Sequence, residues 1–378
     1  MKTLKSMRLH IAIFGRTNAG KSTLLNRIAG QDVSIVSEIA GTTTDVVEKS
    51  MELLPIGPVT FLDTAGLDDV SELGEKRVEK TLKVLNRTDV AVIVRDERGI
   101  SEHETELIEQ LEKLKIPHFI FDRADEVSKF KETLVKLLPD DFVNSPKILG
   151  DLVPAGSTVI LVIPIDKEAP KGRIILPQVQ AIRDLLDSDC LSYVVKETEL
   201  KAALDNLKTP PALVVTDSQA FKQVSEIVPE NIPLTSFSIL FARLKGDLDE
   251  FVKGAQAIDS LQDGDRVLIL ESCTHHAIED DIGRVKIPKW LRQKTGKDLK
   301  IENYAGHDFP DLESPLSPDK YKLIIHCGAC MTNRREVLSR ILIAHEKNIP
   351  ITNYGVAISY CLGILSRAIK IFNPHPNL

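Results

Sequence analysis

One eight-residue stretch constrains this sequence strongly, because its glycines and lysine follow the spacing G-x-x-x-x-G-K-S/T. It runs from Gly15 to Ser22, after the apolar run Leu9 to Phe14 and before a helical pattern from Thr23 to Ile28. Strand, glycine loop and helix in this order are typical of a loop that binds nucleotide phosphates. Backbone N–H groups close around the phosphate oxygens, and the helix points its positive end at them. We expect Lys21 to reach the β- and γ-phosphates and Ser22 to ligate Mg²⁺.

Two polar motifs follow the glycine loop. Residues 40–45, Ala-Gly-Thr-Thr-Thr-Asp, lie between the first helix and the next strand. A switch loop there carries a threonine that ligates Mg²⁺ only when the γ-phosphate is present, and we expect Thr43 in this role, with Thr42 close behind. The apolar run Val59 to Leu62 ends in Asp-Thr-Ala-Gly. In that motif we expect Asp63 to hold Mg²⁺ through water and Gly66 to offer its N–H to the γ-phosphate.

Together these motifs resemble the translation-factor-like GTPases, in particular those related to Era and the tRNA-modification GTPase. In that group an asparagine at the position of Asn18 accompanies a bound K⁺, so the resemblance implies potassium-stimulated hydrolysis of GTP to GDP. It implies Lys21, Thr43 and Gly66 as catalytic groups and Ser22, Thr43 and Asp63 around Mg²⁺. The full set of expected nucleotide-binding residues is Gly15, Asn18, Ala19, Gly20, Lys21, Ser22, Thr23, Thr42, Thr43, Asp63, Gly66, Asp122 and Asp125.

The base-recognition motif departs from that group, which has Asn-Lys-x-Asp where this chain has Asp122-Arg123-Ala124-Asp125. Asp125 matches the carboxylate that pairs with guanine. Asp122 replaces an asparagine whose amide donates a hydrogen bond, and an ionised carboxylate only accepts. The stretch between Asp125 and Ile148 also leaves the final strand and helix of such a domain shortened or absent. Hydrolysis is therefore better supported than base selectivity, and a degenerate, purely structural domain is a further alternative.

Composition limits the remaining possibilities. The chain has 378 residues, which corresponds to about two to three domains. A net charge of −7 argues against nucleic acid as a partner, and no run approaches the ~18 apolar residues of a membrane helix. The first eight residues lack the apolar core of a secretory signal. Five cysteines without a signal indicate a reducing cytoplasm, where clustered cysteines bind metal or act catalytically.

The middle segment, 149–264, alternates apolar strands with helical patterns and therefore predicts a parallel sheet covered on both faces. We expect strands at 158–163, 192–195, 212–216 and 234–242, and helices at 176–187, 197–206, 217–227 and 247–261. No phosphate loop, metal cluster or nucleophile arrangement is visible, and the single Cys190 is expected in the core. This segment is interpreted as a spacer or, better, a subunit interface.

In the last segment, 265–378, two buried-type strands each end in potential metal ligands. Residues 265–270 lead to Cys273 and His275, and residues 321–325 lead to His326, Cys327 and Cys330. Ligands bind at the carboxyl ends of strands in such sheets, so the three cysteines converge if the two strands are neighbours. A helix that begins after Asn333, with Glu336 three residues later, fits a capped start that would favour thiolates nearby.

Three thiolates hold either Zn²⁺ or an iron–sulfur cluster. Zinc requires a fourth protein ligand, for which His275 or His326 is available. A [4Fe–4S] cluster with three cysteines leaves one iron with an exchangeable ligand. The fourth position also suits a carboxylate or water. Cys361 lies in an apolar helical pattern and is expected in the core.

Cys-Thr-His, the long spacer and His-Cys-Gly-Ala-Cys behind an Era-like G domain resemble the [FeFe]-hydrogenase maturation GTPases of the HydF family, as does the run Ile163 to Arg173. The resemblance covers the whole chain. It implies an α/β protein with a P-loop GTPase domain (1–148), a parallel α/β dimerisation domain (149–264) and an α/β iron–sulfur cluster-binding domain (265–378). It also implies a [4Fe–4S] cluster held by Cys273, Cys327 and Cys330.

The family further implies a homodimeric scaffold. That scaffold receives a transient diiron subcluster precursor, made with the radical-SAM maturases HydE and HydG, and delivers it to apo-[FeFe]-hydrogenase. GTP binding and hydrolysis would regulate these partner contacts. The alternative from another class is a zinc-stabilised regulatory GTPase of the Era type, with no part in cluster assembly.

Overall fold

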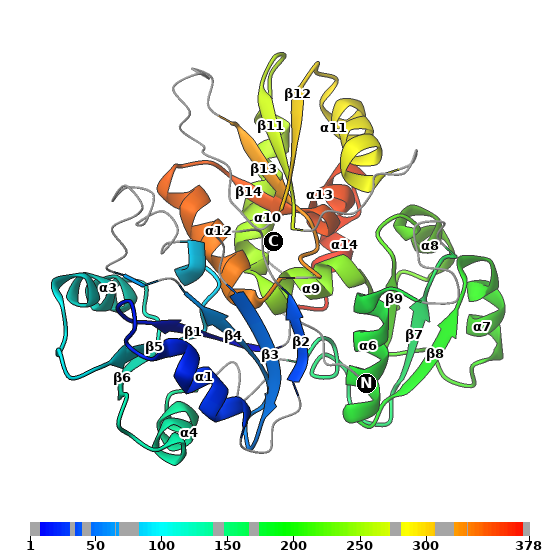
Figure 1. Ribbon diagram of the computed structural model, residues 1–378. Coiled ribbons are helices and arrows are strands. Elements are labelled where there is room, and N and C mark those ends of the chain that lie inside the picture. Colours follow the sequence, from blue (N-terminus) through cyan, green and yellow to red (C-terminus); the bar gives the residue numbers. More distant parts are fainter. Residues whose placement is uncertain are drawn as a thin grey trace. The chain divides into compact units, whose positions relative to one another are not determined.

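The computed structural model describes residues 8–30, 35–39, 47–64, 66–67, 83–138, 147–165, 174–272, 281–306, 321–330 and 332–372. The chain divides into two compact units, unit 1 (1–145) and unit 2 (146–378). Figure 1 labels most of their elements. Within the described residues no helix is long and apolar enough to cross a membrane.

Unit 1 is built on one sheet, whose described strands have the order β2-β3-β4-β1-β5-β6. β1, β4, β5 and β6 are mutually parallel, and β2 and β3 are antiparallel additions at one edge. Every residue of β1 is buried, as a strand covered on both faces requires. The elements of unit 1 are β1 (Leu9–Phe14), α1 (Lys21–Ala29), β2 (Ile35–Ile39), β3 (Val47–Leu53), β4 (Gly57–Asp63), β5 (Val90–Arg95), α3 (Glu102–Lys113), β6 (His118–Asp122) and α4 (Val127–Lys136).

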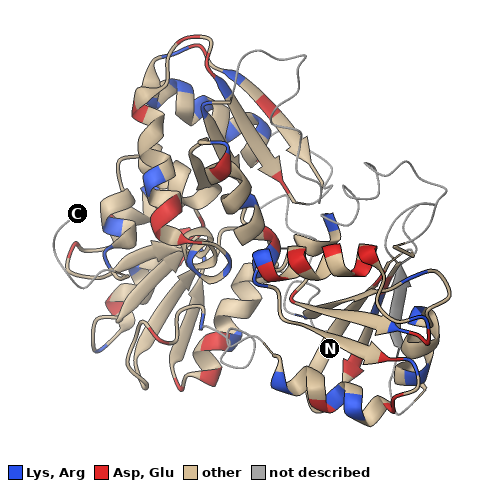
Figure 2. Ribbon diagram, turned by 90° about the vertical axis from the view of Figure 1, so that its left-hand side faces the viewer, with Lys and Arg blue, Asp and Glu red and all other residues tan. Residues whose placement is uncertain are grey.

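After β6, α4 occupies residues 127–136, and the described residues contain no further strand before the end of unit 1. The sheet therefore ends at β6 in the described part, in line with the short stretch that follows Asp125 in the sequence. On α3 the exposed surface is acidic, as Figure 2 shows. Its exposed glutamates are Glu102, Glu106, Glu109 and Glu112.

The first sheet of unit 2 confirms the parallel arrangement predicted for the middle segment, with strand order β10-β9-β7-β8. Its elements are β7 (Thr158–Val162), α6 (Leu176–Asp187), β8 (Leu191–Val195), α7 (Leu200–Asn206), β9 (Leu213–Thr216), α8 (Phe221–Ile227), β10 (Leu234–Ser236) and α9 (Phe237–Lys245).

The strand predicted over residues 234–242 is wrong beyond Ser236, where α9 begins. The Ser236 hydroxyl accepts a hydrogen bond from the Ile239 N–H at 3.3 Å and so caps the helix. α9 packs between two hydrophobic clusters, with Phe237 in one and Ile239 in the other. Because both of its faces are apolar, the sequence shows no helical period, and a buried helix cannot be distinguished from a strand.

The second sheet of unit 2 is also parallel, with strand order β12-β11-β13-β14. The sequence analysis predicted β11 and β13 and did not identify β12 or β14. The elements are α10 (Leu248–Gln256), β11 (Arg266–Glu271), α11 (Ile287–Thr295), β12 (Lys300–Ala305), β13 (Leu323–His326), α12 (Arg334–Glu346), β14 (Ile351–Asn353), α13 (Tyr354–Cys361) and α14 (Leu365–Ile369).

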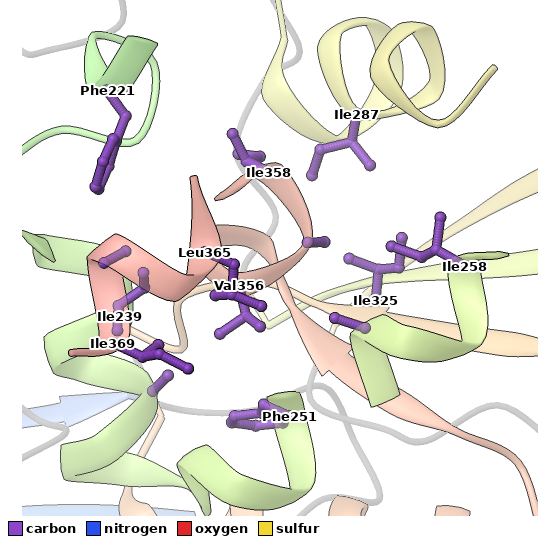
Figure 3. Packing of buried hydrophobic residues seen from close by; sticks show 14 of the residues in the cluster. Phe221, Ile239, Phe251, Ile258, Ile287, Ile325, Val356, Ile358, Leu365 and Ile369 are labelled. Carbon is purple, nitrogen blue, oxygen red and sulfur yellow. The ribbon is translucent and has the colours of Figure 1, made fainter. Parts of the chain in front are cut away.

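One hydrophobic cluster joins the two sheets of unit 2. Figure 3 shows Phe221, Phe251, Ile325 and Ile358, from α8, α10, β13 and α13, gathered in it. α10 packs closely on β14, since a Cβ on Gly254 would lie 1.8 Å from the Ile351 carbonyl oxygen. The three-domain division at residues 148 and 264 stays a prediction, and the packing of α10 favours a second boundary before residue 248.

Candidate functional site

The glycine loop lies at the carboxyl edge of the sheet of unit 1, directly after β1. Gly15 has φ +146°, and a Cβ there would lie 2.7 Å from the Val94 carbonyl oxygen, so only glycine fits. The Lys21 ammonium is buried and donates to the carbonyl oxygens of Gly15 and Arg16, both at 2.9 Å. The Lys21 ammonium therefore lies inside the glycine loop, in the region where the sequence predicted its contact with phosphate.

Two predicted magnesium ligands from distant parts of the sequence meet at this edge. The Ser22 hydroxyl, at the start of α1, donates to Asp63 Oδ2 at the end of β4, at 3.2 Å. Burial raises the pKa of Asp63, against the hydrogen bond from Ser22 and the charge of Lys21. A hydroxyl beside a carboxylate is a donor set that Mg²⁺ prefers.

The Asp-x-x-Gly motif also reaches the loop. A Cβ on Gly66 would lie 2.7 Å from the Thr17 backbone nitrogen, and the Leu67 N–H donates to the Gly15 carbonyl oxygen at 3.2 Å. Asn18 is exposed and has φ 62°, a left-handed conformation that asparagine tolerates. The neighbouring predicted residues Ala19, Gly20 and Thr23 lie in the same loop and first helical turn, whereas Thr42 and Thr43 lie outside the described residues.

The base end of the site contains a pair that the sequence analysis missed. Asp122, the last residue of β6, receives two hydrogen bonds from Arg95, the last residue of β5. Asp125 lies in the following loop and pairs with Lys129 at 2.8 Å. Arg27 of α1 donates to the carbonyl oxygens of Arg123 and Asp125, at 3.2 and 2.8 Å, and holds the loop against the first helix.

The second candidate site lies at the carboxyl edge of the second sheet of unit 2. β11 and β13 are neighbouring strands, with Leu270 in register with His326. The predicted convergence of the cysteines after these strands requires this arrangement. The Cys327 thiol accepts a hydrogen bond from the Ser272 N–H at 3.2 Å, which brings the residue before Cys273 into contact with the second motif. Cys273 and His275 lie outside the described residues, and the described residues contain no group of three potential metal ligands.

The surroundings of Cys327 favour the thiolate form of its side chain. Burial raises the pKa of its thiol, but interaction with His326 and hydrogen bonds from Ser272 and the Ala329 backbone outweigh burial and bring the pKa to about 6. Thiolates are the form that binds metal. The predicted helix start is confirmed, since the Asn333 side chain accepts from the Glu336 N–H at 3.1 Å.

A buried arginine ties the strand ends together. Arg340 of α12 donates to the Ser272 hydroxyl at 2.9 Å, to His326 Nε2 at 2.8 Å and to Glu336 at 2.8 Å. Because arginine only donates, Nε2 of His326 is an acceptor, and Nδ1 carries the proton and donates to the Cys327 carbonyl oxygen at 2.7 Å. Both ring nitrogens are engaged, so this arrangement gives no support to His326 as a cluster ligand.

A buried lysine donates hydrogen bonds to the backbone of the Cys-Gly-Ala-Cys loop and of Thr332. Lys245, at the end of α9, donates to the carbonyl oxygens of Ala329 at 2.7 Å and Thr332 at 2.8 Å, and reaches that of Cys330 at 3.5 Å. Burial lowers the pKa of Lys245 to about 8, against the charges of Cys330, Cys327 and Glu336. The only signal for Lys245 in the sequence is its position as a lysine at the end of a largely apolar segment.

Replacement of Lys245 by methionine should destabilise unit 2. It removes the donor to the Thr332 carbonyl, at a cost of about 1–3 kcal/mol for a buried group left unpaired, whereas the Ala329 carbonyl keeps the Thr332 N–H and hydroxyl as donors. The free energy of unfolding from urea titration measures this, with Lys253→Met as the matched control, because Lys253 is exposed and pairs with Glu250, three residues earlier on the same helix. Equal stability of the two variants would contradict a role of Lys245 in holding the loop.

Comparison with known proteins matches all three parts of the chain. The hydrogen maturase F dimerization domain matches residues 148–246, the hydrogen maturase F tetramerization domain matches residues 249–371, and a family described as 50S ribosome-binding GTPase matches residues 10–122. GTPase Der of Kosmotoga olearia is 39% identical over 135 residues, 34% of this chain and 30% of that protein. tRNA modification GTPase MnmE of Dechloromonas aromatica is 36% identical over 135 residues, 32% and 29% of the two chains.

The chain therefore spans less than a third of the length of these curated relatives. Among solved structures, the G domain of the T. maritima FeoB iron transporter covers 34% of this chain and 98% of its own, at 20% identity and a TM-score of 0.25. That score is too low to support an inference beyond the match itself.

The phosphate loop, the Ser22–Asp63 contact and the matched G domain define a P-loop GTPase domain, followed by two parallel α/β sheets. The hydrogen maturase F matches cover those two sheets and span more than half of the chain. The chain belongs to the hydrogen maturase F family.

Proposed function

We propose that this chain is a GTPase of [FeFe]-hydrogenase maturation that acts as a scaffold and carrier. One observation carries the proposal. The hydrogen maturase F match at 249–371 includes the sheet edge at which the Cys327 thiol accepts a hydrogen bond from Ser272. The buried Lys245 and Arg340 supply positive charge and fixed geometry there, as an anionic thiolate site requires.

Cys273, Cys327 and Cys330 would hold a [4Fe–4S] cluster, which supplies an iron with an exchangeable ligand to dock the diiron precursor. The fourth position stays open, with His275 as one candidate. The partners would be HydE and HydG as sources of the precursor and apo-[FeFe]-hydrogenase as the acceptor. Within the described residues Cys190, Cys327 and Cys361 form no disulfide, which suits a reducing, cytoplasmic environment.

In the same proposal, GTP and Mg²⁺ occupy the edge formed by Lys21, Ser22 and Asp63, and K⁺ binds beside Asn18. Nucleotide state would regulate partner contacts and leave the iron chemistry to the second site. Analysis of the anaerobically purified protein for iron, sulfide and zinc, with an electron paramagnetic resonance spectrum, tests the central claim. A colourless protein that holds one tightly bound zinc would favour the Era-type regulatory alternative.

We further propose a homodimer formed through the edge strand β8. β8 is the outermost strand of its sheet, and it exposes the apolar side chains of Leu191 (60%), Tyr193 (45%) and Val194 (48%). The match to a dimerization domain covers this strand. An exposed apolar edge strand is a template for pairing with another chain, so two copies would pair these edges.

A proline at position 194 should convert the dimer into a monomer. Leu191 donates to Ser157, and Val195 accepts from Ile163, so the backbone groups of alternate residues face β7 and those of Val194 face outward. Proline there removes an outward N–H and spares the bonds to β7. Light scattering coupled to size-exclusion chromatography gives the mass, with Val194→Thr as the control. A dimeric Val194→Pro variant would exclude this edge as the interface.

A further inference from the structure

The pair Arg95–Asp122 supplies hydrogen-bond donors at a position where the base-recognition motif has lost one. A carboxylate stands where the related GTPases have an asparagine that donates a hydrogen bond. Arg95 and Asp122 end two neighbouring parallel strands and are in register with each other. Arg95 Nε donates to Oδ1 at 2.6 Å, and Nη2 donates to Oδ2 at 2.7 Å, so the pair is bidentate.

This pairing changes what the edge presents to a ligand. Both oxygens of Asp122 accept from Arg95, and the hydrogen bond from Arg95 lowers the pKa of Asp122, so the carboxylate stays ionised. A guanidinium has more N–H donors than the two that Asp122 uses. Within the described residues the Arg95 guanidinium hydrogen-bonds only to Asp122, and the side chain is 38% exposed. The remaining N–H groups of Arg95 can therefore donate to a ligand, although Asp122, the residue in the base-recognition motif, can only accept.

The pair lies beside the nucleotide loop. The stem of Arg123, the next residue after Asp122, comes within 3.3 Å of where a Cβ on Gly20 would lie. Arg27 fixes the following loop through the Asp125 carbonyl oxygen. The phosphate loop, Asp125 and the Arg95–Asp122 pair thus share the carboxyl edge of the sheet.

We propose that Arg95, oriented by Asp122, is a specificity-determining residue that donates hydrogen bonds to N7 and O6 of guanine. The inference rests on the proposed GTP site, with Asp125 facing N1–H and the 2-amino group. Guanine N7 and O6 are both acceptors, which two N–H donors of a guanidinium match. Adenine has an N6 amino group in place of O6, and this donor cannot pair with the N–H donors of Arg95. The chain would thereby recover guanine preference without the asparagine.

Titration calorimetry with GDP, ADP and 7-deaza-GDP tests the proposal on the full chain. The wild type should bind GDP more tightly than ADP, and more weakly once N7 is replaced by carbon. Arg95→Ala should weaken GDP binding about tenfold or more and leave ADP unaffected. Arg95→Ala combined with Asp122→Asn should restore GDP binding, because an asparagine amide then supplies the donor.

Arg183→Ala is the matched control, since Arg183 forms a similar exposed bidentate pair with Asp187 in unit 2. Thermal unfolding confirms that each variant is folded. An unchanged GDP-to-ADP ratio in Arg95→Ala overturns the inference. So does a wild type that prefers ADP and loses this preference in Asp122→Asn, which would mean that Asp122 itself reads the base. A wild type that binds no nucleotide overturns the GTPase proposal and this inference with it.

Discussion

Cys327→Ser should yield a nearly colourless protein from an anaerobic purification in which the wild type is brown, with iron and sulfide near one cluster per chain. Serine is almost isosteric with cysteine and can accept the Ser272 N–H, so the fold should persist. The substitution removes the thiolate, with its pKa of about 6, and an alkoxide is not available to replace it as a ligand near neutral pH. The effect on metal content is therefore expected to be near complete.

The matched control is Cys361→Ser. Cys361 ends α13, and burial raises the pKa of its thiol to about 12, so it stays protonated and outside any metal site. Its variant should keep the colour, the iron and the paramagnetic spectrum of the reduced protein. If Cys327→Ser also keeps them, Cys327 is not a ligand, and the cluster assignment for this edge fails.

Lys21→Ala should reduce GTP hydrolysis by about 10²-fold or more, the usual effect of losing one preorganised donor to developing negative charge. In the structure the Lys21 ammonium lies within the loop, where it donates to the carbonyl oxygens of Gly15 and Arg16. Phosphate release should be followed for GTP and ATP, in KCl and in NaCl. The wild type should favour GTP and, if Asn18 accompanies K⁺, should be faster in KCl.

Lys113→Ala serves as the control, because Lys113 is exposed at the end of α3 in the same unit. It should match the wild type in all four conditions. Equal hydrolysis by Lys21→Ala and wild type would mean that this site does not hydrolyse nucleotide and that the G domain has only a structural role.

Comparison of the sequence analysis with the structure shows where local information was sufficient. The apolar strands before the glycine loop, before Asp63 and before Cys327 are continuous and short, and each was found at nearly its observed bounds. The Asn333 cap was also found, because it depends on residues three apart in the chain. By contrast, β14 has only three residues and β12 is mostly polar, so neither carries a clear period.

The sequence by itself determined the phosphate loop, most of the alternation of strands and helices, and the positions of the candidate ligands, because these depend on local patterns of a few residues. Tertiary structure decided which charges meet: Arg95 with Asp122, Lys245 with the Ala329 carbonyl, and Arg340 with His326. These contacts join residues 14 to 84 positions apart. The first contact forms when the parallel strands β5 and β6 align their carboxyl ends, and the other two form when α9 and α12 pack against β13 and the loop that follows it. No local pattern in the chain specifies this packing.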